Sequence, residues 1–531
     1  MFHAEGRGLT FSRQAADYWA RFGPAGRGPL DDRSGTGDLA AVRERLFGGA
    51  GDDTEAETDW RGVLRAHRVT FLVLHADGTL PTEQAVARLA GSPEEWPLLY
   101  LRGRTVVFGW RDPTGGASED RFGAAEVRVD RRAFRPAPAD RAPPEYSGRG
   151  PGRRWSRAFL EPPPAPPPEQ AEAALYLAYF DGQRHLYTAR NEKVWLGSQM
   201  AGLVGSLAAP APGVGPGAVA VAVRAIGVPG DWEAFTAGQD DGPLGALLLA
   251  VRSARRSVRA NPDDAKSYFL LGEAYLRLTE ATRERAWRHQ LPAFDRIRQV
   301  QAITAFQHAL TLRPDSPAAH GRLARLYRER GSFDLALHHL DQSIRVSRAR
   351  DPQPGEHADT RRESLAALER ERGALAEEVR RREEVFETAK GNRRALDLAR
   401  DAAGLGLANR ALDILLKSDA SEFGPEGVRL ELDLLLWAGR VEDVRAWLDP
   451  DLAQSIGSAT YHEILACVAA ATGNYREAGL EMRSVATALV RVPTRLPTPQ
   501  TQAAYDIARA MLSVPFANTT PGTFAHTVLV G

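Results

Sequence analysis

The residues best suited to specific chemistry lie close together between positions 280 and 295. Arginine, tryptophan and histidine side chains gather there with one phenylalanine: Arg283, Arg285, Trp287, Arg288, His289 and Phe294. Guanidinium groups and large aromatic rings carry much of the binding energy at protein interfaces. The segment therefore predicts a contact site for an acidic or aromatic stretch of a partner. An ordered structural flap is the alternative, and Pro292 favours it.

No arrangement typical of a catalytic site is present in the sequence. It contains no HExxH, GxSxG, Walker, DxDxDG or CxxC motif, each of which places reactive groups or a phosphate-binding loop at a fixed spacing. His462-Glu463 lacks the second histidine that a HExxH zinc site needs. Gly213, Gly215 and Gly217 are not followed by the Lys-Ser/Thr of a phosphate-binding loop. We therefore expect a non-enzymatic protein that needs no cofactor.

Two small clusters contain residue types that could bind a metal ion. The adjacent carboxylates of Asp31 and Asp32 could hold a divalent ion, but Arg33 beside them favours a salt-bridged turn. His338 and His339 fall on a predicted helix, where one ring faces solvent and the other caps a neighbouring helix. Metal binding by the two histidines would need a third ligand that the sequence does not offer.

Composition excludes several classes of function. The chain has 531 residues, and its 68 basic and 68 acidic side chains leave no net charge to attract nucleic acid. The single Cys467 excludes an internal disulfide, and its apolar surroundings in residues 464–471 predict a buried structural thiol. No apolar run approaches the roughly 18 residues of a membrane span, and the start lacks the apolar core of a secretory signal. These features predict a cytoplasmic, soluble chain.

The elements that position the side chains follow from a repeating pattern of small and aromatic residues. Its members are Tyr268, Leu271, Gly272, Tyr275, Ala302, Phe306, Ala309, Pro314, Leu323, Ala324, Tyr327, Gly331 and Ala336, and Ala302 and Ala336 are 34 residues apart. Small residues allow two helix backbones to pass closely, aromatic rings fill the space between neighbouring helices, and proline ends a helix. The pattern resembles the tetratricopeptide repeat, a helix–turn–helix unit of 34 residues.

This resemblance implies consecutive antiparallel helix pairs over residues 244–350. Ala250 and Ala254 occupy the second helix of a first, partial unit. The next unit is interrupted by 18 extra residues around positions 279–296, which include the basic and aromatic segment described above. We expect Gly272 to pack against the helix that contains Ala302.

A different pattern occupies residues 1–135. The apolar, β-branched run Val69–Leu74 predicts a strand buried on both faces, at the centre of a small sheet. A helix is expected over residues 82–89, and a hairpin of two strands over residues 98–110. Together with a helix over residues 12–22, these elements predict a small α/β domain.

The rest of the chain is expected to connect or extend these two regions. It comprises a proline-rich linker (136–168), a helical connector with a Gly/Pro-rich loop (169–243), a long charged helix (356–390), degenerate repeat-like helix pairs (391–514) and a tail (515–531). A paired coiled coil is possible for the charged helix. Arg372 and Arg382 occupy two of its core positions, so a single helix leaning on the repeats is favoured.

A second resemblance concerns roughly residues 10 to 112. It depends on an ordered series of motifs, namely Trp60, Val63-Leu64, Val69–Leu74, Trp96, Tyr100, Gly103 and Val106–Phe108. The series is similar to the soluble C-terminal region of bacterial membrane glycosyltransferases of the dolichyl-phosphate-mannose type. The resemblance implies an α/β domain that continues into tetratricopeptide repeats on the outer side of a membrane. It carries over no catalytic residue, because catalysis in that class belongs to loops between membrane helices.

The sequence therefore predicts a mixed fold, with a small N-terminal α/β domain followed by a mostly α-helical tetratricopeptide-repeat solenoid. The expected function is a scaffold that binds a protein or peptide on the concave face of the repeats, without nucleic acid and without a membrane span of its own. The alternative is an accessory region of a membrane glycosyltransferase system, with a periplasmic or outward-facing location and membrane association through a partner.

Overall fold

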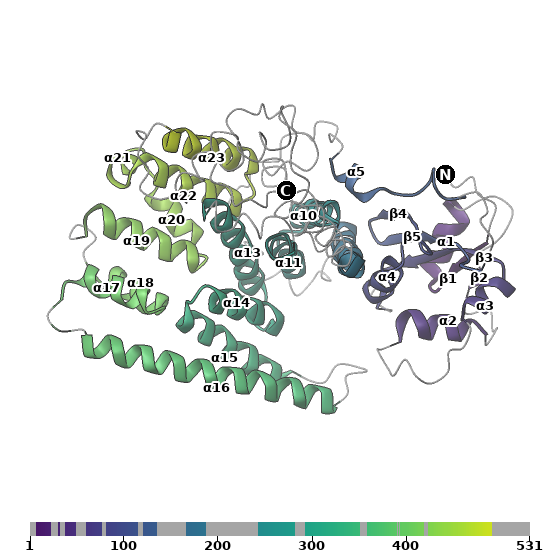
Figure 1. Cartoon of the computed structure of the whole chain (residues 1–531), viewed down its shortest axis with the longest axis horizontal. Coiled ribbons are helices and arrows are strands. Elements are labelled where there is room, and N and C mark those ends of the chain that lie inside the picture. The colour runs from purple at the N-terminus through teal and green to yellow at the C-terminus, as the bar shows by residue number, and fades with distance from the viewer. Residues whose placement is uncertain are drawn as a thin grey trace, which may run out of the picture. The chain divides into compact units, whose positions relative to one another are not determined.

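The computed structural model describes residues 7–22, 30–31, 38–48, 60–76, 81–114, 121–134, 166–186, 243–281, 292–350, 358–389, 391, 393–418 and 423–490. These residues are mostly helical, with one small sheet near the N-terminus (Figure 1), as the expected fold class requires. They divide into two compact units. The first contains the sheet, the helix over residues 168–186 and α10 (Leu244–Ala260); the second contains almost all of α11 (Ala265–Glu280) and the helices from α13 (Pro292–Leu312) onward.

The sheet of the first unit has five strands in the order β2-β1-β3-β5-β4. They are β1 (Arg7–Thr10), β2 (Leu30–Asp31), β3 (Val69–His75), β4 (Leu98–Arg102) and β5 (Thr105–Gly109). β3 is central: it pairs with β1 in parallel and with β5 in antiparallel, and all its residues except His75 are buried. The prediction of a central strand flanked by a hairpin is confirmed. β1 and β2 were not predicted, because each is too short to show a pattern.

An aromatic contact holds the first helix on the sheet. Trp19 of α1 (Arg13–Phe22) lies with its ring 5.1 Å from the ring of Phe71 in β3. Gly8 in β1 makes room for it, since a Cβ atom at that position would lie 2.6 Å from the indole. The helices α2 (Asp38–Phe47), α3 (Trp60–Ala66) and α4 (Thr82–Ala90) complete the domain, with α2 packed against both others.

Three of the tryptophans form a column beside the sheet. The Trp60 and Trp96 rings stack at 5.7 Å, and the Trp96 and Trp110 rings at 6.1 Å. Glu95 ties the column together, because its carboxylate accepts two hydrogen bonds from Arg61 and one from the Trp110 indole. The guanidinium carbon of Arg61 lies 5.3 Å from the centre of the Trp60 ring. Arg61 therefore contacts both Trp60 and the carboxylate that holds Trp110.

The first unit is larger than the predicted domain of residues 1–135. Glu172, on the helix over residues 168–186, is buried and accepts hydrogen bonds from the Gly103 N–H at 3.0 Å and from Arg256 at 3.2 Å. Arg256 belongs to α10, which packs against α5 (Val129–Phe134). The sequence pattern assigned α10 to the repeats and the 168–186 helix to a connector. The structure places both helices in the first unit. The sequence could not show this, because helices with small, apolar faces look alike in sequence whatever surface they cover.

The second unit consists of helices joined by short turns. From α14 onward they are α14 (Pro317–Glu329), α15 (Phe333–Ala349), α16 (Ala358–Ala389), α17 (Ala395–Gly404), α18 (Ala408–Leu416), α19 (Gly424–Trp437), α20 (Val441–Trp447), α21 (Leu452–Ile456), α22 (Ser458–Ala471) and α23 (Tyr475–Val490). The predicted tail (515–531) lies outside the described residues, as does most of the predicted linker.

Four helix pairs of this unit have the same type of turn between their two helices. The pairs are α14–α15, α17–α18, α19–α20 and α22–α23, and their turns contain Gly331, Gly406, Gly439 and Gly473. The φ angles of these glycines lie between 73° and 84°, a left-handed conformation that other residues rarely adopt. Each glycine N–H donates to the carbonyl three residues back, and the next N–H to the carbonyl five residues back. This is the Schellman pattern of a helix C-terminus.

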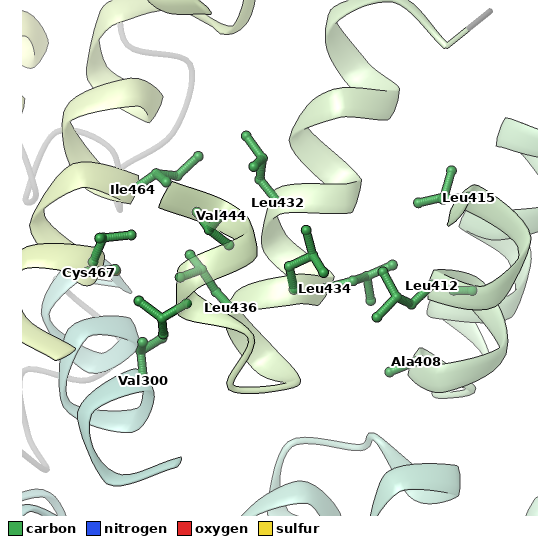
Figure 2. Packing of buried hydrophobic residues seen from close by; sticks show 14 of the residues in the cluster. Val300, Ala408, Leu412, Leu415, Leu432, Leu434, Leu436, Val444, Ile464 and Cys467 are labelled. Atoms are coloured by element: carbon green, nitrogen blue, oxygen red, sulfur yellow. The ribbon is translucent and has the colours of Figure 1, made fainter. Parts of the chain in front are cut away.

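The turns also set a common register. The last three turn glycines are 33 and 34 residues apart. The fifth residue after each glycine is buried at the helix crossing, and these residues are Ala336, Ala411, Val444 and Ala478. A buried cluster joins α13, α16 and the last three of these pairs into one core (Figure 2), and partly buried Phe333, Leu335 and Leu337 of α15 pack against it. The degenerate helix pairs predicted after residue 391 therefore form, and each consists of two helices around a glycine turn.

The interrupted unit keeps its predicted packing. Gly272 of α11 lies against Phe306 of α13, so that an added Cβ atom would lie 2.7 Å from the ring. Ala302 is on the same helix, α13, one turn earlier. The expected contact between Gly272 and the helix of Ala302 is confirmed.

α13 is longer than the repeat register requires. It begins ten residues before Ala302, whereas α15 begins three residues before Ala336, the matching position. α13 packs against α14 and also against α22, about 150 residues further along the chain (Figure 1). Residues 296–306 are all buried. The helix pairs therefore do not form a simple open row, because α13 contacts both the next pair and the last one.

The charged run forms one helix, α16, which packs against α15. Leu375, Val379 and Phe386 are buried on it. The Arg382 guanidinium carbon lies 4.0 Å from the centre of the Phe333 ring on α15. This packing agrees with a single helix leaning on its neighbour.

The contact at Gly272 predicts opposite effects for one substitution at two helical glycines. Alanine in place of glycine favours a helix by about 1 kcal/mol, and Gly321→Ala should show this gain, since its Cβ would meet only Ser343 Oγ at 3.7 Å. Gly272→Ala must displace the fully buried Phe306 ring and should lose about 1–3 kcal/mol of unfolding free energy. Denaturant unfolding of the two variants checks this. Equal effects at both positions would contradict the close packing.

Candidate protein-interaction surface

The basic and aromatic segment predicted to bind a partner is only partly described. Arg283, Arg285, Trp287, Arg288 and His289 lie outside the described residues, and Phe294 lies in α13. The side chains of residues 296–306 on α13 are buried. This end of the 18-residue insertion is therefore structural.

Arg296 shows what the extra turns of α13 do. Its side chain is buried and forms ion pairs with Asp433 of α19 and with Glu463 of α22, the latter at 3.2 Å. The ring of Trp437 lies 5.9 Å from the guanidinium carbon. One cation thus joins three separate helices. Such a buried pair specifies which surfaces meet, whether or not it adds net stability.

Cys467 lies in the same region of α22 and is fully buried. Burial raises the pKa of its thiol to about 12. A thiol that stays protonated at neutral pH is a poor nucleophile. The prediction of a structural cysteine is confirmed.

His462 and Glu463 point to different partners. His462 Nδ1 lies 2.6 Å from Glu481 on α23, whereas Glu463 pairs with Arg296. They are packing residues, as the absence of a second histidine indicated. Asp31 lies in β2, and Asp32 and Arg33 lie outside the described residues. Within the described parts of the chain, no three His, Cys, Asp or Glu residues are grouped closely enough to hold a metal ion.

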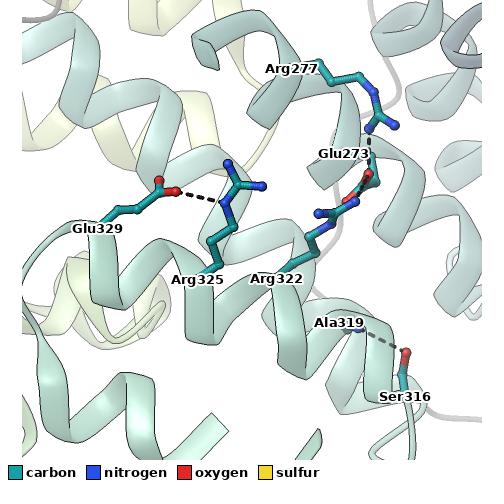
Figure 3. A network of polar contacts seen from close by, with 7 residues as sticks. All are labelled: Glu273, Arg277, Ser316, Ala319, Arg322, Arg325 and Glu329. Carbon is teal, nitrogen blue, oxygen red and sulfur yellow. Dashed lines mark hydrogen bonds and ion pairs between the residues drawn. The ribbon is translucent and has the colours of Figure 1, made fainter. Parts of the chain in front are cut away.

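A network of polar contacts joins α11 to α14 in the second unit (Figure 3). Glu273 of α11 has a side chain that is 6% exposed, and it accepts hydrogen bonds from two arginines. Arg277 donates at 2.5 Å, and Arg322 of α14 donates through Nε at 2.6 Å and Nη2 at 3.1 Å. One carboxylate therefore fixes two guanidinium groups, which leaves a local excess of positive charge.

Arg322 is held in place and still accessible. Its side chain is 37% exposed, and its third nitrogen, Nη1, has no acceptor among the described residues. Arg325 lies one turn further along α14, with a side chain 46% exposed and an ion pair to Glu329 at 2.8 Å. An exposed pair of this kind is worth at most about 1 kcal/mol. We call Arg277, Arg322 and Arg325 the arginine row.

The arginine row was missed by sequence reasoning. Arg322 and Arg325 are three residues apart, a spacing that places them on one helix face. This signal was visible, but the carboxylate that orients Arg322 is 49 residues away in the sequence. Only the packing of α11 beside α14 brings the two together.

His338 and His339 behave as predicted in one respect. His338 is exposed, and His339 is buried. The buried ring does not cap a helix; its Nδ1 lies 3.0 Å from Nδ1 of His320 on α14. No third His, Cys, Asp or Glu of the described residues lies close enough to join the two rings around a metal ion.

Comparison with known proteins gives no match: no protein-family model fits the sequence, and no curated protein is detectably similar to it. Among the described residues, no helix is both long enough and apolar enough to cross a membrane.

The Arg296 ion pairs predict a large effect for one arginine and almost none for another. Arg296→Met leaves Asp433 and Glu463 without their shared cation at a partly buried site and should cost about 2–4 kcal/mol of unfolding free energy. Arg362→Met, on α16, removes a pair whose arginine is 78% exposed and should change stability by less than about 0.5 kcal/mol. Urea unfolding of the full chain measures both. A loss for Arg296→Met no greater than that of the control would contradict a joining role.

Proposed function

We propose that this protein is a non-enzymatic scaffold of the tetratricopeptide-repeat type, which holds a protein partner through an acidic segment of that partner. The observation that supports the repeat type best is the recurrence of one glycine turn in four helix pairs. The last three turns follow at 33 and 34 residues, the period of that family. Repeat units of this kind bury a continuous core only together, and proteins built from them present extended surfaces to peptides.

The arginine row supports the choice of partner chemistry. A guanidinium presents its N–H donors in a planar fork that matches a carboxylate. Glu273 holds Arg322 in one orientation, so little side-chain entropy is lost when a partner carboxylate binds. Arg325 can exchange its weak pair with Glu329 for a partner carboxylate on the same helix face. An extended segment with two or more Asp or Glu residues fits this row.

The insertion extends the proposed site. Arg283, Arg285, Trp287, Arg288 and His289 follow α11 directly in sequence and carry the same positive charge with a large aromatic ring. Phe294 is also part of the contact site predicted from the sequence, but it belongs to α13, in which residues 296–306 are buried. We therefore place the recognition part of the insertion before Pro292.

The chemistry of the row predicts which partner sequences bind and which variant loses them. Peptides selected from a random display library against the full chain should be enriched in Asp and Glu. Arg325→Ala should weaken a selected peptide at least about fivefold by fluorescence anisotropy, because it removes a charge-assisted hydrogen bond. Arg381→Ala is the control, because Arg381 is an exposed arginine of α16 with an ion pair to Glu378 on its own helix.

Two results would sink the proposal. One is a library that yields no enrichment of acidic residues. The other is a selected peptide that binds the Arg325→Ala and Arg381→Ala chains equally well. Deleting residues 282–290 separates the insertion from the row: it leaves α13 whole, and a further loss of affinity would assign those residues to the site.

A further inference from the structure

The joint between α13, α14 and α15 contains a chain of hydrogen bonds through two histidines. Gln307 Nε2 on α13 lies 3.5 Å from Nε2 of His339 on α15. Nδ1 of His339 lies 3.0 Å from Nδ1 of His320 on α14. Nε2 of His320 lies 3.1 Å from the carbonyl oxygen of Pro314, in the turn between α13 and α14. The chain thus touches all three helices and the turn that joins two of them.

The geometry fixes where the protons lie when both rings are neutral. The Pro314 carbonyl can only accept, so His320 Nε2 carries a hydrogen and donates to it. His320 Nδ1 is then a lone pair, and His339 Nδ1 must donate to it. His339 Nε2 is left as an acceptor that faces the amide N–H of Gln307. Each ring has one donor and one acceptor, and every one of them is used.

Burial and the neighbouring charges of the joint disfavour an additional proton, and they outweigh the Pro314 carbonyl, which favours positive charge on His320. A proton on His320 Nδ1 would set two N–H groups against each other unless His339 moved its own hydrogen to Nε2. A hydrogen on His339 Nε2 would then face the Gln307 amide hydrogens. From α15, His338 and Arg345 disfavour positive charge on the pair. From α14, the Tyr327 ring stacks on His339 at 5.5 Å. His308 of α13 turns to Tyr268 instead, at 5.2 Å.

We propose that this histidine pair makes the α13–α14–α15 joint a pH-sensitive element of the helical array, closed at neutral pH and loosened in mildly acidic solution. Protonation requires the pair to leave its buried position, which separates α15 from α13 and α14. The rest of the second unit has no comparable histidine pair among its described residues.

The direction and size of the effect follow from linkage. Burial lowers the pKa of His339 to about 3 and also lowers the pKa of His320. An opened joint would titrate near the ordinary value of about 6.5, so it binds protons that the closed joint excludes. Closure is therefore fully stable above about pH 7 and weakens as the pH falls through 6.5. Protonation of His339 alone should lower the equilibrium constant for closing the joint about thirtyfold by pH 5.

Hydrogen–deuterium exchange of the full chain between pH 7.5 and 5.0, corrected for intrinsic rates, tests this. Peptides from α14 and α15 should lose protection by about thirtyfold relative to those from α22. His339→Gln keeps a neutral hydrogen-bonding side chain and should remove most of the pH dependence. His338→Gln, the same change at the exposed neighbour, should retain it. Equal pH dependence in the two variants would overturn the proposal.

A second measurement needs no variant. Nitrogen-15 NMR of labelled histidines should find, at pH 7.5, His339 with its hydrogen on Nδ1 and His320 with its hydrogen on Nε2. At lower pH, His339 should become charged only as α15 loses its protection from exchange. A His339 ring that titrates near pH 6.5 while α15 stays protected from exchange would also overturn the proposal.

Discussion

The second unit depends on the burial of α13. Eleven consecutive residues of this helix, 296–306, are inaccessible, which is unusual because an amphipathic helix normally keeps one face in water. Its Phe306 packs against Gly272 of α11, and α13 also reaches α22. Other contacts converge on the same helix, since a Cβ atom at Gly439 would lie 2.8 Å from Gln307. α13 thus connects helices that lie far apart in the sequence.

The arginines divide into groups according to burial. Arg296 is buried and joins three helices through two carboxylates. Arg322 is fixed by the buried Glu273 but keeps an exposed edge, which is the arrangement expected of a recognition residue. On α16, pairs such as Arg380–Glu377 are exposed on both sides and contribute mainly to solubility and helix propensity. Charge alone does not distinguish these roles. They differ in how deeply the arginine and its partner carboxylate are buried.

The sequence predicted local structure well and long-range contacts poorly. The apolar run of β3, the glycine turns and the contact of Gly272 with the next helix follow from residue type and spacing, and all three are confirmed. The contact of α13 with α22 and the packing of α10 on α5 were not predicted, since they depend on surfaces that meet only after folding. For the same reason the arginine row was missed, because its key feature is a carboxylate on another helix. The sequence pointed to His338 and His339 as a pair, but the hydrogen-bond partner of His339 is His320, 19 residues away.

The most direct test of a closed array is amide exchange of α13 in the full chain at pH 7.5. A helix buried on every side and held between α14 and α22 should open only when the whole unit unfolds. Amides of residues 297–306 should therefore exchange as slowly as the slowest amides of α22, and Arg296→Met should accelerate both together. Exchange of these α13 amides at the rate of the exposed helix α16, with α22 still protected, would contradict the closure.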